Sequence, residues 1–216
     1  MDKILVLDFG SQTTALIGRR IRELGVYSEV IPGDTAFTDE FLSGDIFKGV
    51  KGLVLSGSPE SVYTKEGARP DKKIYSLNLP LLGICYGLQV MTQMLGGKVE
   101  PLPRREYGGV GVTVSAASVP KHAVPFFSSF KKKPVFTAWM SHGDTLTKLA
   151  SGFILIGTSE TGYPAVVIHD TKPWFGLQFH PEVTHCENGM AILEKFAFGV
   201  CGCEKSWTME KYAEEV

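Results

Sequence analysis

Leu81-Leu82-Gly83-Ile84-Cys85-Tyr86-Gly87-Leu88-Gln89 is the stretch of sequence that decides the fold. Residues 81–84 carry no charged or polar side chain, as is typical of a strand covered on both faces of a parallel sheet. A helical pattern runs from residue 88 to residue 95 and is closed by two glycines. The stretch therefore predicts a buried strand that turns sharply into a helix.

The segments before this strand predict a parallel sheet. Residues 4–7 and 26–31 are short β-branched and aliphatic runs, and apolar residues at helical spacing lie between them until Gly25. Residues 53–55 form a third run of the same kind. Strand, helix, strand is the opening of an α/β sheet with parallel strands.

The sequence beyond residue 98 changes to short strand-like segments separated by turn residues, which predicts antiparallel strands added to the sheet. The expected strands are 110–114, 135–138, 153–157, 165–168 and 174–179, and a helix is expected over 187–200. The predicted fold class is thus α/β: a three-layer, open, mainly parallel sheet flanked by helices, with antiparallel strands in the C-terminal half.

Composition and charge exclude several classes of function. The chain has 216 residues, 44% of them hydrophobic, and its 22 Lys plus Arg against 23 Asp plus Glu give a net charge of −1. Disorder is excluded, and nucleic acid is a poor partner for a chain without a basic excess. No apolar run approaches the roughly 18 residues of a membrane helix, and the start lacks a signal-peptide pattern. We therefore expect a cytoplasmic protein that binds no membrane.

Cys85 is the candidate nucleophile. It occupies the centre of residues 83–87, which have the G-x-nucleophile-x-G form of a nucleophile elbow with Cys in place of Ser. The flanking glycines let the backbone turn sharply without a collision, and a strained backbone is expected at the central residue. The N-terminus of the following helix favours a thiolate and offers N–H groups to a developing oxyanion.

A thiol nucleophile needs a base, and His180-Pro181-Glu182 supplies the best one. His180 and Glu182 stand two residues apart after an expected strand, so Glu182 can orient the imidazole. A zinc site formed by His180, His185 and Cys186 is a weak alternative, because the later Cys-x-Cys lacks the usual spacing. We expect no metal. The chain also lacks the dinucleotide and P-loop motifs, so no cofactor is expected in it.

These motifs resemble those of the class I, triad-type glutamine amidotransferases, over nearly the whole chain. The resemblance rests on residues 83–89 together with His180-Pro181-Glu182. The further motifs are similar to those of the amidotransferase part of GMP synthases; they are residues 8–12, 105–108, 140–144, 180–185, Cys201-Gly202-Cys203 and Trp207. The family fold is flavodoxin-like, which agrees with the sheet predicted above.

The resemblance implies a role for each candidate residue. Cys85 would attack the side-chain amide of glutamine, His180 would protonate the departing ammonia and then activate water, and Glu182 would orient His180. The implied oxyanion donors are the backbone N–H of Tyr86 and one from the Gly57–Ser58 loop. The implied residues for the amino-acid end of glutamine are Gln89, Ser141, His142, Gly143 and Asp144. Without the resemblance, residues 141–144 would be interpreted as a polar turn.

Two residues depart from the family pattern. Ser58 stands where the family usually has glycine, and a positive φ at this position would cost a serine about 1–2 kcal/mol. Such strain predicts a less populated active loop and a slower enzyme in the absence of a partner. Thr13 stands where the family commonly has an aromatic residue, and we expect it to affect packing alone.

The resemblance also implies a partner. The chain has no Ser-Gly-Gly-x-Asp-Ser pyrophosphate loop, so the ATP-pyrophosphatase, or GMP synthetase, half must be another domain or subunit that brings ATP and Mg²⁺. We expect residues 1–200 to be the amidotransferase domain and 201–216 a linker, the start of a missing synthetase domain, or a tail. The end of the chain favours an excised domain. The function implied is delivery of ammonia for amination of xanthosine monophosphate. The alternatives are service to another acceptor synthase and an inactive regulatory module.

Overall fold

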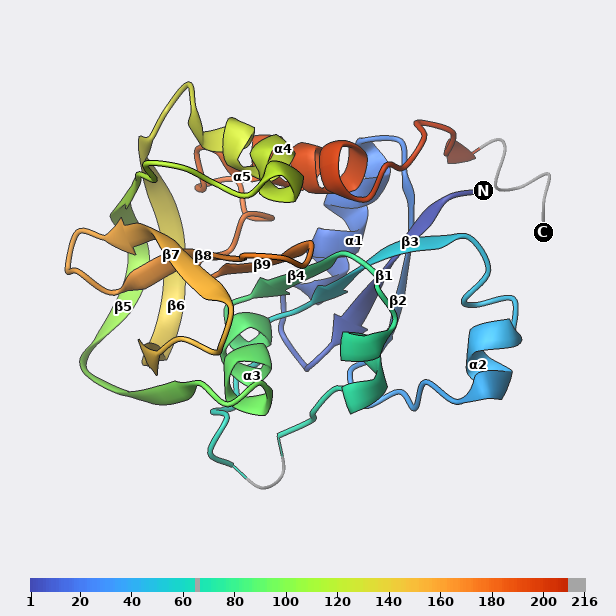
Figure 1. The fold of residues 1–216 in the computed structure, drawn as a ribbon, viewed down its shortest axis with the longest axis horizontal. Helices are drawn as coiled ribbons and strands as arrows, with labels where there is room; N and C mark the ends of the chain where they lie inside the picture. The colour runs from blue at the N-terminus through green and yellow to red at the C-terminus, as the bar shows by residue number, and fades with distance from the viewer. Residues whose placement is uncertain (65–66, 210–216) are drawn as a thin grey trace.

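The computed structural model describes residues 1–64 and 67–209, which form a mixed sheet between two layers of helices (Figure 1). The strands are β1 (Lys3–Asp8), β2 (Tyr27–Pro32), β3 (Val50–Leu55), β4 (Leu81–Ile84), β5 (Lys98–Val114), β6 (Val135–Lys148), β7 (Phe153–Ser159), β8 (Pro164–His169) and β9 (Trp174–Leu177). The α-helices are α1 (Thr14–Glu23), α2 (Asp39–Ser43), α3 (Tyr86–Met94), α4 (Val124–Phe127) and α5 (Gly189–Glu194). Three 3₁₀ helices, η1 (Lys72–Ser76), η2 (Lys121–Ala123) and η3 (Ser128–Phe130), and a π-helix, η4 (Lys195–Val200), complete the described elements.

The described strands follow the order β2-β1-β3-β4-β9-β8-β7-β5-β6 across the sheet. The first five run parallel to one another, and the pairs from β9–β8 onward are antiparallel. The fold class predicted from the sequence is therefore confirmed. All four residues of β4 are buried, as a strand covered on both faces should be.

Strand β9 corrects one prediction. The sequence pattern placed residues 174–179 among the added antiparallel strands, but β9 pairs in parallel with β4, Ile84 standing opposite Leu177. It meets only β8 in antiparallel fashion. The sheet register thus brings the carboxyl ends of β4 and β9 side by side, and the segments that follow them meet at one edge.

Strands β5 and β6 are much longer than predicted and carry the second correction. Residues 141–144 lie within β6, paired with β5, rather than in a polar turn. Pro101 pairs with Asp144 and Glu106 with His142, so residues 102–105 of β5 stand opposite Gly143 alone. Extra residues of this kind form a bulge, and bulges commonly re-aim side chains beside active sites.

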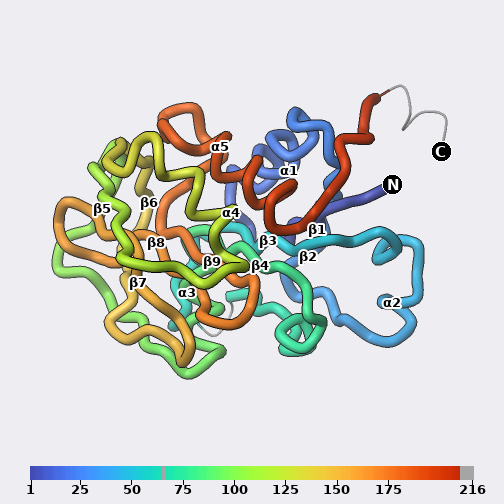
Figure 2. Tube along the Cα trace, turned by 45° about the horizontal axis from the view of Figure 1, so that its top comes forward, coloured from blue at the N-terminus to red at the C-terminus, as the bar shows by residue number. Residues whose placement is uncertain are grey.

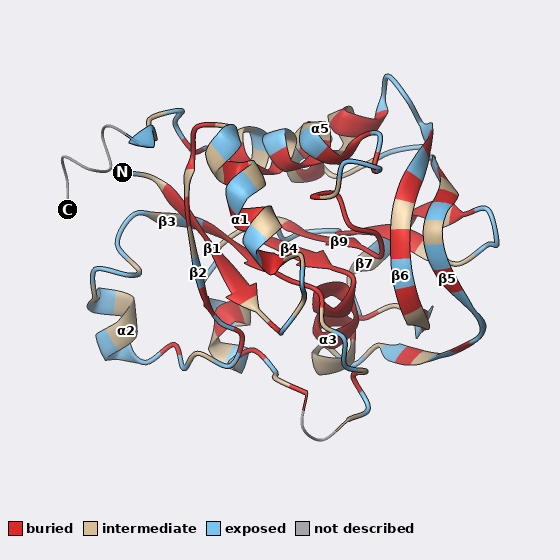
Figure 3. Cartoon of the chain, turned by 180° about the vertical axis from the view of Figure 1, so that it is seen from behind, coloured by how far each residue is buried: buried red, intermediate tan, exposed pale blue. Residues whose placement is uncertain are grey.

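Helices cover both faces of the sheet. Helices α1, α4 and α5 lie on one face and α3 on the other, while α2 lies at the periphery (Figure 1). Each face has its own hydrophobic core, and burial is continuous through the central strands and α3 (Figure 3). The central strands β1, β3, β4 and β9 are therefore largely buried, whereas β2, β5, β6 and β7 carry more exposed residues.

The helical predictions are partly confirmed. Helix α1 ends before Gly25, whose φ of +87° is the left-handed conformation usual after a helix, and α3 ends before Gly96. The helix expected over 187–200 is divided into α5 and the π-helix η4. The short helices α2 and α4 were not predicted, because pieces of four or five residues have no measurable periodicity.

The segment after η4 returns to the amino ends of the first strands (Figure 2). The backbone N–H of Glu204 donates to Asp2 at 3.0 Å, and that of Trp207 donates to the Gly25 carbonyl at 2.9 Å. Residues 201–209 of the segment predicted as a linker or tail are thus attached to the body. Residues 210–216 of that prediction lie outside the described residues. All four cysteines are free thiols, as expected.

No helix in the described part of the chain has the length and apolarity needed to cross a membrane.

Substitution of Gly87, the second glycine of the elbow, tests the packing of the fold. A methyl group there would overlap the carbonyl oxygen of Leu55 on β3, whereas one on Gly96 would meet no atom within 4 Å. Gly87→Ala should lower the free energy of unfolding by about 3 kcal/mol, the upper end of the usual cost of overpacking. The matched control, Gly96→Ala, should cost about 1–2 kcal/mol from its positive φ. Urea unfolding measures both; equal costs would contradict the proposed packing of the elbow.

Candidate active site

Cys85 lies at the sharp turn between β4 and α3. Its φ of +52° and ψ of −108° place it in a strained conformation, and only Asn78 shares a positive φ among the described non-glycine residues. A methyl group on Gly83 would come within 2.7 Å of the Leu88 nitrogen, and Gly87 lies against β3. The strained elbow expected from the sequence is therefore present, and its strain is compatible only with glycine on both sides.

His180 and Glu182 follow β9 and face the elbow. The His180 backbone N–H donates to the Trp139 carbonyl at 3.0 Å, which fixes the chain after β9 against β6. Nδ1 of His180 lies 2.7 Å from Oε1 of Glu182, and the Cys85 side chain is the other group that interacts with the His180 imidazole. With Nδ1 engaged by the carboxylate, Nε2 is the nitrogen left for the sulfur. The three side chains thus stand in the order expected of a nucleophile, a base and an orienting acid.

The surroundings of His180 make it a strong base. Burial lowers the pKa of the imidazole, but the hydrogen bonds with Cys85 and Glu182 and their charges outweigh burial and raise the pKa to about 10. At neutral pH the imidazole is therefore protonated between two acidic groups. An imidazolium in this position can protonate a leaving amine.

Glu182 is the most enclosed member of the three, with 1% of its surface exposed. Its backbone carbonyl accepts from Nε of Arg20 on α1 at 3.0 Å, which ties the residue to the helical layer. Its second carboxylate oxygen, Oε2, is buried and has no partner among the residues that the structure describes. Among the described residues, the hydrogen bond of this carboxylate goes to His180.

The Gly57–Ser58 loop follows β3 and lies beside the triad. A methyl group on Gly57 would stand 3.1 Å from Cε1 of His180. Ser56 accepts from the Phe9 N–H and donates to the Gly57 carbonyl, both at 3.0 Å. Because the two ends of a trans peptide unit point in opposite directions, this bond directs the Ser58 N–H away from Ser56.

Ser58 corrects the strain argument made from the sequence. It is not among the described residues with positive φ, so it carries none of the strain expected of a serine in place of glycine. Its hydroxyl accepts from the Glu60 N–H at 3.0 Å, a bond that glycine would lack and that stabilises the loop locally. The backbone strain is located at Cys85.

A cleft of about 570 Å³ opens in front of Cys85, within the range of small-molecule sites. It contains all five residues assigned to glutamine by the resemblance, and its lining consists of Ser58, Pro59, Glu60, Ser61, Cys85, Tyr86, Gln89, Pro101, Leu102, Arg105, Tyr107, Ser141, His142, Gly143 and Asp144. A second hollow of about 380 Å³ lies on the His180 side and shares Ser58, Pro59 and Ser141 with the first. Thr13, which was expected to affect packing alone, lines this second hollow.

Hydrogen bonds within the protein order the far wall of the cleft. The Asp144 carbonyl accepts from Nε2 of Gln89 at 3.0 Å and from Nδ1 of His142 at 2.8 Å. Nε2 of His142 lies 2.8 Å from the buried Glu106 carboxylate, whose other oxygen accepts from Thr161. Both ring nitrogens of His142 are therefore engaged within the protein, and the ring supports the wall.

The sequence analysis assigned no role to three groups at the site. Gln178 is fully buried and donates from Nε2 to Sγ of Cys85 at 3.7 Å. Glu106 anchors His142, and Arg105 enters the cleft through the bulge in β5. For Gln178 the available signal was its position as a polar residue at the end of an apolar strand. The bulge that places Arg105 in the cleft leaves no recognisable pattern in a single sequence.

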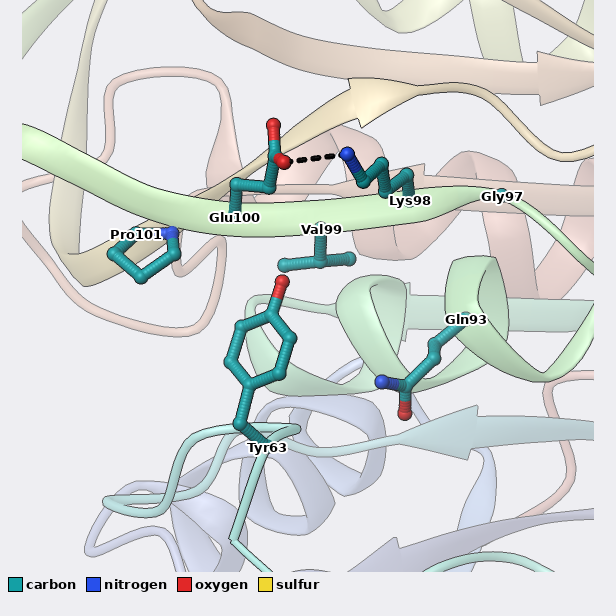
Figure 4. Close-up of a pocket in the computed structure, with 7 residues that line it drawn as sticks. All are labelled: Tyr63, Gln93, Gly97, Lys98, Val99, Glu100 and Pro101. Carbon is teal, nitrogen blue, oxygen red and sulfur yellow. Dashed lines mark ion pairs between the residues drawn. The ribbon is translucent and has the colours of Figure 1, made fainter.

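Another hollow, of about 330 Å³, lies between β5 and the end of α3 (Figure 4). The Tyr63 ring points towards β5 there, and Lys98 pairs with Glu100 at 2.6 Å (Figure 4). Both charged side chains are exposed to solvent, so the pair is weak. No group of three or more potential metal ligands occurs in the described part of the chain. The cleft at Cys85 is the better candidate site.

Comparisons with known proteins agree with this geometry. The family model for class I glutamine amidotransferases matches residues 5–200. The chain is 42% identical over 216 residues to a glutamine-hydrolyzing GMP synthase of Brachyspira hyodysenteriae and 45% identical over 213 residues to one of Bacillus cereus. Each alignment covers 99% of this chain and 39% of the relative.

Two solved structures are similar over nearly the whole chain. A protein of Thermoplasma acidophilum, provisionally described as one subunit of a GMP synthase, has a TM-score of 0.74 and 29% identity, with 100% of this chain and 98% of that one covered. A Thermotoga maritima glutamine amidotransferase has a TM-score of 0.64 and 19% identity, with 99% and 91% covered, and shares the fold.

The strained cysteine, the paired histidine and glutamate, and the match over residues 5–200 place this chain in the class I glutamine amidotransferase family. Within that family it is homologous to the glutamine-hydrolysing part of GMP synthases, and it spans about 39% of the length of the curated GMP synthases that it matches.

The protonation of His180 gives a testable pH dependence. In wild-type protein the imidazole should remain protonated at pH 7.5 and lose its proton only as the pH approaches about 10. Because this pKa exceeds the value of 6.5 for an unperturbed imidazole, the contribution of His180 to stability is complete below about pH 6.5 and is lost as the pH rises towards 10. Glu182→Gln removes a raising charge and should lower this pKa.

Side-chain ¹⁵N NMR of the histidines measures the titration, with His180→Asn to assign the resonance. A neutral imidazole at pH 7.5 in the wild-type protein, or an unchanged pKa in Glu182→Gln, would contradict the charge arrangement.

Proposed function

We propose that this chain hydrolyses the side-chain amide of glutamine through Cys85, His180 and Glu182. In this proposal the ammonia passes to an ATP-dependent synthetase that aminates xanthosine monophosphate to GMP. The observation that carries the proposal is the pairing of His180 with Glu182 at 2.7 Å beside the strained Cys85, which stands at a helix N-terminus. An inactive module would not need this arrangement.

The first half of the reaction forms a thioester. The Cys85 sulfur attacks the amide carbon of glutamine, and the negative charge moves to the carbonyl oxygen. The N–H of Tyr86 is free of helical bonding because α3 begins there, so it can donate to that oxygen, together with an N–H of the Gly57–Ser58 loop. The His180 imidazolium gives its proton to the amide nitrogen as the C–N bond breaks and ammonia leaves.

The second half releases glutamate. His180, now neutral, takes a proton from a water molecule, and the hydroxide attacks the thioester carbon. The C–S bond breaks, glutamate departs, and the Cys85 thiolate and His180 imidazolium are restored. Glu182 keeps its charge throughout and holds the ring in one orientation.

The cleft offers complementary charges to the amino-acid end of glutamine. We assign the α-ammonium group to Asp144, whose carboxylate is held by Ser61 at 2.6 Å, with Gln89 and residues 141–143 completing the wall. Arg105 is the guanidinium in the lining and suits the α-carboxylate.

The partner proposed is an ATP-pyrophosphatase, or GMP synthetase, present as a further domain or a separate subunit. That partner holds ATP and Mg²⁺, and the chemistry assigned to this chain requires no cofactor. We propose residues 1–200 as the amidotransferase domain and 201–216 as the connection to a synthetase half or a tail. The cytoplasmic location and the lack of nucleic-acid and membrane partners stay predictions.

The nucleophile is tested by labelling. Cys85→Ala should abolish glutamate release, and a chloroketone analogue of glutamine should modify Cys85 alone. Burial raises the pKa of Cys186 to about 12 and raises that of Cys201, whereas a hydrogen bond with Cys201 lowers the pKa of Cys203. Cys203 is therefore the internal control. Peptide mapping decides, and labelling chiefly at Cys203 would remove Cys85 from the mechanism.

Coupling to the partner is tested by kinetics. Because unpartnered hydrolysis wastes glutamine, this chain alone should release glutamate slowly. A synthetase part with ATP and xanthosine monophosphate should accelerate it about 5- to 150-fold, the usual range of coupling between sites. Steady-state glutamate release with and without the synthetase measures this, with Cys85→Ala as the blank. Full activity of the isolated chain would refute the coupling and leave the chemistry intact.

A further inference from the structure

Gln178 links the nucleophile to the polar wall of the cleft. It follows β9 directly and is fully buried. Its Nε2 donates to Sγ of Cys85 at 3.7 Å, and its Oε1 accepts from Nε2 of Gln89 at 3.3 Å. Both ends of the amide are therefore engaged, one of them by the reactive sulfur.

The orientation of the Gln178 amide is fixed from outside the triad. Gln89 can donate to Gln178 because its own amide is held by the Asp144 carbonyl, which also accepts from His142. His142 is in turn anchored by Glu106. Since a donor already faces the oxygen of Gln178, its NH₂ group is the end that faces Cys85.

The sulfur needs such a donor. On another side, Sγ of Cys85 lies 3.7 Å from the Ser141 carbonyl oxygen, which can accept from a thiol but repels a thiolate. An anion that is 4% exposed is costly unless hydrogen-bond donors compensate for the lost water. The amide of Gln178 supplies one such donor. It stabilises a thiolate at Cys85, whereas the Ser141 carbonyl destabilises it.

We propose that Gln178 is a positioning residue for the nucleophile: it stabilises the Cys85 thiolate, and the chain from Gln89 to Glu106 keeps its amide turned towards the sulfur. The inference rests on the proposed function in taking Cys85 as the nucleophile. Gln178 is fully buried and is not among the described residues that line the cleft, so we expect it to make no contact with the substrate. Its loss should therefore lower kcat and leave KM nearly unchanged.

The test compares three variants of the full chain. Gln178→Met keeps the length of the side chain without a donor, and Gln178→Glu places a carboxylate beside the sulfur. Gln93→Met is the control for the Gln-to-Met exchange itself, because Gln93 lies on α3 and its side chain accepts from Arg69 and is not bonded to Cys85. The rate of Cys85 alkylation by iodoacetamide is followed by peptide mass spectrometry from pH 5 to pH 10, beside kcat and KM for glutamine hydrolysis.

Loss of one hydrogen bond to a charged group predicts alkylation at pH 7 and kcat about tenfold lower in Gln178→Met, a larger fall in Gln178→Glu, and wild-type values in Gln93→Met. The alkylation profile of both Gln178 variants should move to higher pH. A wild-type profile in Gln178→Met, or a rise in KM at constant kcat, would overturn the proposal. Alkylation needs no glutaminase activity, so a shifted profile in a protein that does not hydrolyse glutamine would overturn the proposed function alone.

A measurement on unmodified Gln178 covers the case in which its variants do not fold. The side-chain amide resonances of Gln178 should shift on titration of the wild-type protein between pH 5 and pH 10 and should shift less in Cys85→Ala. Equal shifts in the two proteins would overturn the proposal.

Discussion

The parallel pairing of β4 with β9 is the interaction on which the site depends. It aligns the ends of two strands that are separated by about ninety residues of sequence, and the Cys85 N–H closes the ladder on the Leu177 carbonyl at 2.7 Å. One strand then turns into a helix at the cysteine, and the other continues to the histidine. The close approach of Gly87 to β3 holds the turn in place. A register shift of one residue would rotate every side chain after β9 to the opposite face.

Burial of charge determines the character of the site. Cys85, His180 and Glu182 all lie below one-tenth exposure, where isolated charges are unfavourable. The protein compensates with neighbouring side chains: Glu182 and Cys85 stabilise the imidazolium, and Gln178 donates to the sulfur. Such groups do not reorient when charge moves during a reaction, which is the physical advantage of a preorganised site.

The sequence was sufficient for features encoded locally. The apolar residues 81–84, the two glycines around Cys85 and the His-Pro-Glu motif each carry their own physical signal, and they predicted the strand, the elbow and the triad. The sequence was insufficient for features that depend on a contact with a segment distant in the sequence. The direction of β9 depends on β4, and the strand conformation of residues 141–144 depends on pairing with β5. The absence of strain at Ser58 likewise depends on its loop, since a family pattern gives the residue type but not the backbone angle.

The path of the chain after η4 determines where a protein domain connected to this segment would be attached. Glu204 is held beside Asp2, and Trp207 beside Gly25, at the amino ends of β1 and β2, whereas the cleft lies beyond the carboxyl ends of β4 and β9. A protein domain joined after residue 209 would thus start from the edge of the sheet opposite the cleft. Covalent attachment there would raise the effective concentration of that domain near this chain, but it would not orient the domain relative to the cleft. Its alignment with the cleft would have to come from surface complementarity, which serves a separate subunit equally well.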